Sequence, residues 1–410
     1  MSVALGKYRD VLRLPGVGML LVLMSVARIP VSAISMVLTL HVVLTLHHSY
    51  GAAGLVGAAG TVGVAIGAPL AGRLVDGWGL RGMVVITTLA NGAYWLTTWR
   101  LDYPWLLVLS FFGGLLDLPV MSIGRQAMAA LVPPEHRRTA FSLDSISLEL
   151  SFMVGPALAV IVATRASTSI AMISLGGLIL AAGVALFVVN PPVRGQHDED
   201  EPTGVRPPRR VWLRPPLLAV LAAALGAVFV LAGIEVATVA ALRSVGEISW
   251  TGVVTIAMCA ASMIGGLIYG ALRRSPGPLV LMVLLAVLAI PVGLAGAQWW
   301  VLALALVPTN LMCAPTLAAT GDDVSRLAPA AVRGEAMGLQ SSALTLGGAL
   351  GAPVIGTVVD HLGAAGGFAA AGLGGLLIAV LAFPLARRRT PVLPDGPAGD
   401  VTPVTAGQAG

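Results

Sequence analysis

The chain is dominated by long apolar runs separated by short polar or Gly/Pro-containing breaks. A helix that crosses a bilayer needs roughly 20 apolar residues. Hydrophobic residues make up 57% of the chain and charged residues 10%, whereas soluble domains have roughly 45–50% and about 25%. We therefore predict an all-α membrane protein with twelve transmembrane helices, at 16–44, 52–74, 82–100, 104–126, 139–164, 168–189, 216–242, 249–272, 278–297, 299–320, 336–359 and 364–386.

The same pattern excludes several classes of protein. The apolar runs are continuous, whereas the strands of a transmembrane β-barrel alternate between apolar and polar residues. Twelve spans leave no room in 410 residues for a sizeable catalytic domain, so we do not expect an enzyme. The sequence has no Gly-rich phosphate-binding loop ending in Lys and Ser or Thr, which argues against direct coupling to ATP. A membrane topology explains the formal net charge of +5 better than a nucleic-acid partner, so we expect no nucleic acid.

No residue pattern points to a metal or another cofactor. His41, His47 and His48 cluster near the end of the first span, but no carboxylate or cysteine accompanies them at metal-ligand spacing. We therefore expect surface histidines, no metal site and no cofactor. The two cysteines, Cys259 and Cys313, lie in apolar runs and are expected to be buried, unreactive thiols.

One long polar segment divides the chain into two halves. Residues 190–215 contain four consecutive acidic residues and clustered prolines, a composition that cannot bury a core and is typical of a flexible linker. We therefore expect six-helix bundles at 1–189 and 216–389, joined by a cytoplasmic linker at 190–215. The Pro- and Gly-rich segment 390–410 is expected to be a disordered tail.

Basic residues indicate the orientation in the membrane. With the amino terminus inside, the inner segments carry twenty of the 24 Lys and Arg residues and the outer segments carry three, Arg100, Arg165 and Arg243. Cytoplasmic loops carry such an excess, so we expect both termini to be cytoplasmic. Arg28 interrupts the first apolar run, which argues against its removal as a signal peptide. One lysine against 23 arginines is typical of a GC-rich bacterial genome, so we expect a bacterial cytoplasmic membrane.

A short segment recurs in the two halves. Seven of thirteen positions match between GAPLAGRLVDGWG at 67–79 and GAPVIGTVVDHLG at 351–363. These segments close the second and eleventh spans, which run in opposite directions through the membrane. Nested, inverted three-helix repeats are a building principle of secondary transporters and would place such a match here. Chance similarity is the alternative, because small residues recur wherever helices pack closely.

The turn after the second span, GRLVDGWGLR at 72–81, resembles motif A of the major facilitator superfamily. Gly72 allows a close helix approach, Gly79 allows a tight turn, and Asp76 offers a charge to a neighbouring helix N-terminus. The resemblance implies that Asp76 and Arg81 help to latch two bundles on the cytoplasmic side. Gly77 stands where this motif usually has an arginine, so the basic part of the motif is reduced.

The fifth span contains a second motif, SFMVGPALA at 151–159. It resembles motif C of the drug:proton antiporters in the same superfamily, with Ser151 and Ala159 in place of the flanking glycines. A Gly-Pro pair, here Gly155 and Pro156, bends a helix and lets another helix pack against it. The resemblance covers nearly the whole chain and implies membership of the efflux branch of this superfamily.

Charged and polar residues inside the predicted spans are the candidate transport residues. Such side chains are costly in a bilayer, so they normally face a cavity or a partner and mark a transport path. In the superfamily, spans 1, 4, 7 and 10 line the central cavity, and each of these spans supplies one candidate here. The alternative is a structural ion pair of Arg28 with an acidic candidate. The full set is Arg28, Asp117, Glu149, Glu235 and Asn310.

Other charged residues are interpreted without a transport role. Asp144 is near the cytoplasmic edge of the fifth span and is expected to be a helix-start charge. A further group belongs to a predicted cytoplasmic loop, and comprises Asp322, Asp323, Arg326, Arg333 and Glu335.

These residues favour a secondary active transporter that exports small lipophilic or amphiphilic compounds in exchange for protons. A carboxylate in an apolar cavity can bind and release a proton near neutral pH. Arg28, Asp117 and Glu235 sum to −1 when ionised, so one proton or one cationic substrate would neutralise the set. Two alternatives are uptake or exchange of a small anionic metabolite bound by Arg28, and a lipid-handling or scaffold membrane protein that does not transport.

Overall fold

The computed structural model describes residues 2–48, 50–193, 208–272, 276–296 and 298–387. All regular secondary structure within these ranges is helical, as predicted. Most of the predicted linker, at 194–207, and the whole predicted tail, at 390–410, lie outside the described residues.

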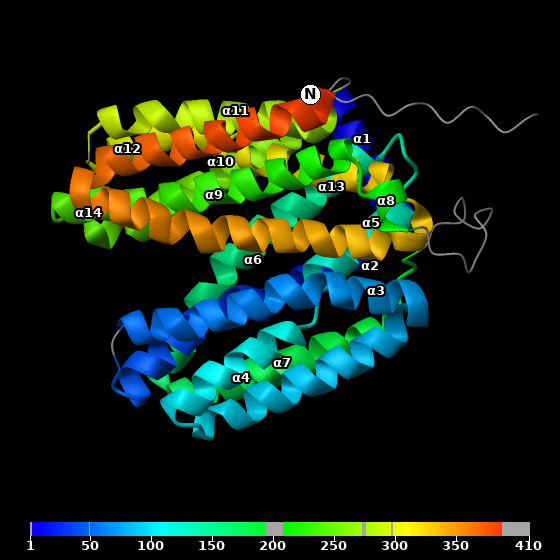
Figure 1. Ribbon diagram of the computed structural model, residues 1–410, viewed down its shortest axis with the longest axis horizontal. Coiled ribbons are helices and arrows are strands. Elements are labelled where there is room, and N and C mark those ends of the chain that lie inside the picture. Colours follow the sequence, from blue (N-terminus) through cyan, green and yellow to red (C-terminus); the bar gives the residue numbers. More distant parts are fainter. Residues whose placement is uncertain (1, 49, 194–207, 273–275, 297, 388–410) are drawn as a thin grey trace, which may run out of the picture.

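The first half of the chain begins with a short helix, α1, which lies near α10 (Thr251–Ala271) of the second half, and continues into a bundle (Figure 1). The second and third spans form one continuous helical stretch, α3, and the fourth span is divided into α4 and α5. The elements are α1 (Ser2–Arg13), α2 (Val17–Leu40) with a π-helical end (His41–Thr45), α3 (Tyr50–Thr97), α4 (Tyr103–Leu115), α5 (Val120–Leu131), α6 (Arg137–Arg165) and α7 (Thr168–Val189).

The second half repeats this plan. The tenth span is divided into α12 and α13, and the last two spans form the continuous stretch α14. The elements are α8 (Arg209–Trp212), α9 (Pro215–Ser244), α10 (Thr251–Ala271), α11 (Pro278–Ala289) with a 3-10 end (Ile290–Leu294), α12 (Trp299–Asn310), α13 (Cys313–Leu327) and α14 (Arg333–Arg387).

The helix lengths agree with twelve spans. In the described part of the chain, nine helical segments are long and apolar enough to cross a membrane. The two longest, Ala52–Arg100 and Ala330–Arg387, each reverse direction once, and the shorter apolar segment Pro278–Leu294 takes the place of the ninth span. Both reversals occur at a glycine with positive φ, Gly79 at +79° and Gly363 at +72°. These glycines close the two copies of the repeated segment, so matching sequence makes matching turns.

Small residues bring the helices of each bundle into backbone contact. A Cβ atom at Gly63 or Gly67 of α3 would overlap the backbone of α4. The equivalent contacts in the second bundle join α14 to α9, where a Cβ at Gly347 or Gly351 would overlap the α9 backbone. Transmembrane helices associate through close packing of this kind, because lipid offers no hydrophobic drive between them.

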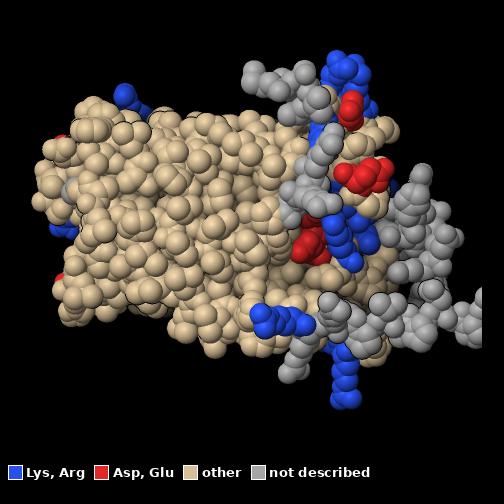
Figure 2. All heavy atoms as spheres, turned by 90° about the horizontal axis from the view of Figure 1, so that it is seen from above, with Lys and Arg blue, Asp and Glu red and all other residues tan. Residues whose placement is uncertain are grey.

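Charged side chains gather at one end of the molecule (Figure 2). We call this the charged end and define it by Arg73, Asp76, Arg209 and Glu335, which meet there. The two bundles are joined at this end along two helix pairs, α3 with α14 and α6 with α10. In Figure 1, α3 and α14 approach each other toward the charged end, where α5 and α8 also lie.

Candidate functional site

Asp76 of α3 joins the two bundles at the charged end. Its carboxylate accepts hydrogen bonds from the backbone N–H groups of Gly334 at 3.0 Å and Glu335 at 2.9 Å, in the first turn of α14. A helix N-terminus carries roughly half a positive charge, so an ionised carboxylate is stabilised there. The helices can approach this closely because a Cβ at Gly72 would overlap the Gly334 carbonyl.

Glu335 forms the other half of this junction. Its buried carboxylate pairs with Arg73 of α3 at 3.0 Å and with Arg209 of α8 at 2.6 Å. The sequence interpretation gave Glu335 no role and did not single out either arginine. The sequence did contain one indication that Glu335 has a structural role. It stands in the first turn of α14, two residues after Arg333, and acidic residues favour helix N-termini.

Arg81 does not take part in this junction. Its guanidinium donates to the carbonyl of Phe187 at 3.2 Å and lies over the Phe187 ring, which belongs to α7 of the same bundle. The structure therefore places Gly72 and Asp76 between the bundles and Gly79 in the turn, while Arg81 braces the N-terminal bundle.

The second junction joins α6 to α10 and includes the terminal helix α1. Thr139 and Arg138 of α6 donate to the carbonyls of Gly270 and Leu272 at 2.8 and 2.7 Å. From α1, Lys7 donates to the Ala271 carbonyl at 2.8 Å, and Tyr8 donates to carbonyls one turn earlier in α10. Burial raises the pKa of Tyr8 to about 12, so its hydroxyl remains a donor at physiological pH. Four donors thus cap the C-terminal carbonyls of α10.

Both junctions loosen with distance from the charged end. Along the facing stripe of α10, Gly270, Gly266 and Ser262 are buried, Cys259 is half-buried, and Thr255 is exposed. The stripe of α3 changes in the same way, from buried residues at 72 and 68, through half-buried residues at 65 and 61, to an exposed residue at 58. The facing stripes are therefore buried at the charged end and exposed toward the opposite end, and from this exposure we infer a cleft between the bundles there.

Glu149 lies where the α6 and α10 junction ends. Its carboxylate accepts hydrogen bonds from the Ser262 hydroxyl at 2.7 Å and the Cys313 thiol at 3.3 Å, both in the C-terminal bundle. Glu235 is exposed on α9, and its charge interacts with that of Glu149. An electrostatic interaction thus links two carboxylates that come from opposite bundles.

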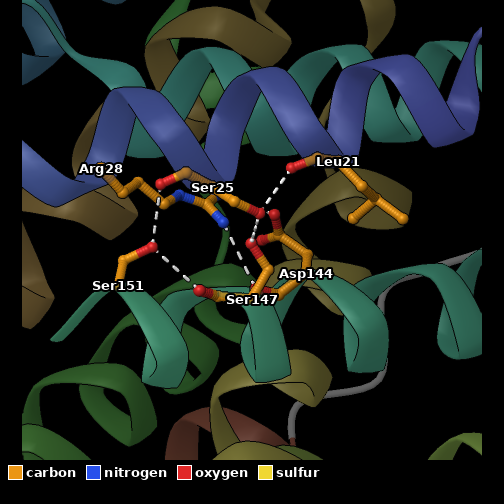
Figure 3. A network of polar contacts seen from close by, with 6 residues as sticks. All are labelled: Leu21, Ser25, Arg28, Asp144, Ser147 and Ser151. Carbon is orange, nitrogen blue, oxygen red and sulfur yellow. Dashed lines mark hydrogen bonds and ion pairs between the residues drawn. The ribbon is translucent and has the colours of Figure 1, made fainter. Parts of the chain in front are cut away.

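Arg28 is paired with Asp144, which corrects two expectations (Figure 3). Arg28 Nη2 lies 2.7 Å from Asp144 Oδ1, and the two side chains are 1% and 3% exposed. The suggested partners Asp117 and Glu235 are engaged elsewhere, and Asp144 is a buried ion-pair partner rather than a helix-start charge at the edge. Arg125, counted among the inner-loop charges, is also buried and its charge interacts with this pair.

The ion pair stands within a polar network between α2 and α6. The hydroxyls of Ser25 and Ser147 are 2.6 Å apart, and Ser151 donates to the Ser25 carbonyl at 3.0 Å. On the next turn of α6, Gly155 packs so closely on α2 that a Cβ would overlap the Ser32 hydroxyl. Gly155 therefore allows the close approach of α6 to α2, and the bend expected at Pro156 stays a prediction.

Asp117 and Asn310 mark the interruptions of the fourth and tenth spans. Asp117 lies between α4 and α5 and accepts a hydrogen bond from Asn91 of α3 at 2.7 Å. Asn310 is the last residue of α12, is buried, and donates to the Leu306 carbonyl one turn earlier at 3.0 Å. The sequence interpretation treated both spans as continuous. These breaks occupy equivalent places in the two bundles, as expected when the second half of the chain repeats the first.

The described residues contain no cluster of three or more His, Cys, Asp or Glu side chains that could hold a metal ion. His41 departs from the sequence interpretation, because it is fully buried and shares a hydrogen bond with the Thr168 hydroxyl at 3.1 Å. His47 and His48 are exposed. Cys313 is buried and Cys259 is half-buried.

Two closed helix-pair junctions at one end, a cleft toward the other and a broken helix at the same place in each bundle are features of a secondary transporter fold. Comparison with known families agrees, since the sequence model of the Major Facilitator Superfamily matches residues 20–290 and 239–406. The chain belongs to this superfamily. No relative among curated proteins matches it by sequence.

Solved structures share the fold at low sequence identity. The human organic anion transporter MFSD10 (TETRAN) aligns with a TM-score of 0.67 and 17% identity, over 92% of this chain and 99% of that chain. The proton:xylose symporter XylE, bound to 6-bromo-6-deoxy-D-glucose, aligns with a TM-score of 0.71 and 14% identity, over 90% and 96%. A bacterial homologue of the iron transporter ferroportin, in an outward-facing state, aligns with a TM-score of 0.68 and 16% identity, over 90% and 98%. These are transporters and not enzymes, and the chain is a membrane transporter of the same fold.

Proposed function

We propose that the protein exports small lipophilic or amphiphilic cations in exchange for protons by alternating access. The observation that carries this proposal is the electrostatic interaction between two carboxylates of opposite bundles, Glu149 of α6, which contacts Ser262, and Glu235, which is exposed on α9. Two ionised carboxylates repel each other, and binding of one positive charge relieves that repulsion. A proton and a cationic substrate therefore compete for one site, and competition of this kind produces antiport.

The carboxylate pair replaces the charge set suggested by the sequence. Arg28 is neutralised by Asp144 in a buried pair, so it does not offset the charges in the cleft. Asp117 is held by Asn91 at the break of the fourth span, and we assign it a supporting role in shaping that break. Asn310 has the matching position in the tenth span.

We place the charged end in the cytoplasm of a bacterial cell. Of the 24 Lys and Arg residues, the sequence assigns twenty to segments on this side, and a positive bias of this kind marks the cytoplasmic face. The amino-terminal helix α1 and the linker helix α8 both lie at this end (Figure 1). The cleft then opens to the outside, so the structure corresponds to an outward-facing state, as the ferroportin homologue does. We keep the bundle boundaries 1–189 and 216–389, with 190–215 as linker.

An anionic substrate bound by Arg28 is the weaker alternative. Arg28 is 1% exposed, and such a substrate would have to displace the Asp144 carboxylate from it at 2.7 Å. A scaffold that does not transport is also weaker, because it has no use for two carboxylates in a cleft, whose burial is costly.

The test is a flux assay with the full chain in proteoliposomes under an imposed pH gradient. Tetraphenylphosphonium, a neutral dye and an anionic dye represent the three charge classes. We expect gradient-driven movement of tetraphenylphosphonium with counterflow of protons, and loss of both in Glu235→Gln. Asp102→Asn, which removes an exposed acidic residue at the start of α4, is the matched control and should transport normally. Transport of the anionic dye alone, dependent on Arg28, would replace our proposal with the anion alternative, and no transport in any class would favour a scaffold.

A further inference from the structure

Glu149 is connected to the start of α13 through a short hydrogen-bond relay. The Ser262 hydroxyl donates its only hydrogen to Glu149 at 2.7 Å and accepts the backbone N–H of Ala314 at 3.1 Å. The Cys313 thiol donates to the same carboxylate oxygen at 3.3 Å. Both Cys313 and Ala314 are in the first turn of α13, so a carboxylate of the N-terminal bundle is tied to a helix N-terminus of the C-terminal bundle.

This helix N-terminus exists because the tenth span is interrupted. α12 ends at Asn310 and α13 starts at Cys313, so the first backbone N–H groups of α13 have no partner within the helix. The 15-residue α13 also presents the positive end of its dipole there. An ionised Glu149 is stabilised by both features. A protonated Glu149 loses the charge that strengthens these bonds, and charge-assisted hydrogen bonds are roughly twice as strong as neutral ones.

At the charged end, Asp76 makes the more direct form of this contact, because its carboxylate accepts the backbone N–H groups of the first turn of α14 without an intervening side chain. Each of the two helix-pair junctions therefore has a carboxylate of the N-terminal bundle bound at a helix start of the C-terminal bundle. Their surroundings differ. Asp76 stands among the charged groups of the closed end, whereas half-buried Glu149 stands where the α6 and α10 junction ends.

The titratable groups that face Glu149 from the neighbouring helices are acidic rather than basic. Glu235 faces it from α9, and the thiols of Cys259 and Cys313 face it from α10 and α13. On its own helix, the nearest charged residue is Asp144, which is neutralised by Arg28. Arg125 of α5 interacts with that pair rather than with Glu149. The charge acting most directly on Glu149 is thus a second carboxylate.

We propose that ionised Glu149 is a clamp that holds the charged end closed, and that a proton on this carboxylate frees Ser262 and α13 and lets the charged end open. This inference rests on the proposed proton-coupled exchange and names the residue that links the proton to the conformational change. The proton enters through the cleft, opens the opposite side, and leaves there when a cation takes its place at the carboxylate pair.

Distance measurements between spin labels test the clamp without any transport assay. Labels on cysteines introduced at Glu135 and Pro276, exposed residues beside the α6 and α10 junction, report whether the charged end is closed. The background carries Cys259→Ala and Cys313→Ser, because serine keeps a donor to Glu149. We expect a closed charged end at pH 8 and an increase of about tenfold in the open-to-closed ratio at pH 6, within the usual range of such couplings.

Variants assign the pH dependence to a residue. Glu149→Gln should give the open-shifted ratio at both pH values, and Ser262→Ala should shift the ratio in the same direction at pH 8. Glu235→Gln should retain a pH-dependent ratio, since the clamp itself is intact. A ratio in Glu149→Gln that equals the unsubstituted background at pH 8, or that still changes tenfold between pH 8 and 6, would overturn the clamp. Because these measurements use no substrate, they can fail while cation transport is observed, and the reverse is also possible.

Discussion

Replacing Asp76 by asparagine should open the charged end. The carboxylate accepts two backbone hydrogen bonds from the first turn of α14, at 3.0 and 2.9 Å. An asparagine side chain has one acceptor oxygen, so one N–H group loses its partner and the charge at the helix N-terminus disappears. A hydrogen bond to a charged group contributes about 1.5–3 kcal/mol and the helix-terminus interaction about 0.3–1 kcal/mol. Because Asp76 is half-buried and partly screened by solvent, we expect a total near the lower end, about 2 kcal/mol.

A change of about 2 kcal/mol corresponds to a shift of about 30-fold in the ratio of open to closed molecules. The spin-label pair at positions 135 and 276 measures this ratio in the full chain reconstituted in bilayers. Arg81→Gln is the matched control, because Arg81 comes from the same turn but contacts Phe187 within one bundle. An unchanged ratio in Asp76→Asn, or an equal shift in Arg81→Gln, would refute the assignment of the latch to Asp76.

Three further outcomes are expected. Asp144→Asn leaves the buried Arg28 unpaired and should lower the free energy of unfolding by about 3–5 kcal/mol, measured by denaturant unfolding in detergent. Adding Arg28→Gln should restore part of this loss. An unchanged free energy of unfolding in Asp144→Asn would contradict a buried pair. Gly72→Ala should hold the charged end open in the spin-label assay, because a Cβ atom at this position has no space. Gly77→Ala is the control, since a Cβ atom there meets no neighbour and the variant should behave as the parent. Normal closure of Gly72→Ala would contradict the packing. Tyr8→Phe should raise the open-to-closed ratio about threefold, because one hydrogen bond is lost. In the parent, the Tyr8 contact should persist below pH 10 and disappear as the pH rises toward about 12, the pKa of its hydroxyl. A ratio in Tyr8→Phe equal to the parent's would show that α1 does not restrain closure.

The sequence predicted the architecture well because membrane insertion is governed by a strong, local signal. A run of about 20 apolar residues must form a helix in lipid, since every backbone group has to find a partner within the segment. The repeat ending in Gly79 and Gly363 was also readable, because a turn with positive φ strongly favours glycine. The interruptions of the fourth and tenth spans were not predicted, since apolar residues continue through both breaks.

The charged residues were harder to place, because a sequence position gives the depth of a side chain but not the direction it faces. Arg28 and Asp144 are 116 positions apart, and only the crossing of α2 with α6 brings them together. For the same reason, Glu335 was assigned to a loop without a role, although its carboxylate pairs with Arg73 of α3 and Arg209 of α8. Asp76 was found because its segment resembles motif A of the superfamily, and that resemblance implied a latch between the bundles.

Two carboxylate contacts hold the charged end closed, one at Asp76 and one at Glu149. The first does not change with pH, and the second responds to protons. Asp76 and Glu335 join the two bundles at the charged end, where Asp76 binds the first turn of α14 and Glu335 pairs with Arg73 and Arg209. Glu149 has no such arginine among its contacts, and Glu235 adds a like charge. A latch that cannot titrate would make an outward-facing state permanent, and a latch made only of titrating groups would open without substrate. With one latch that does not titrate and one that does along the same interface, the closed state is stable, and a single proton on Glu149 can still release it.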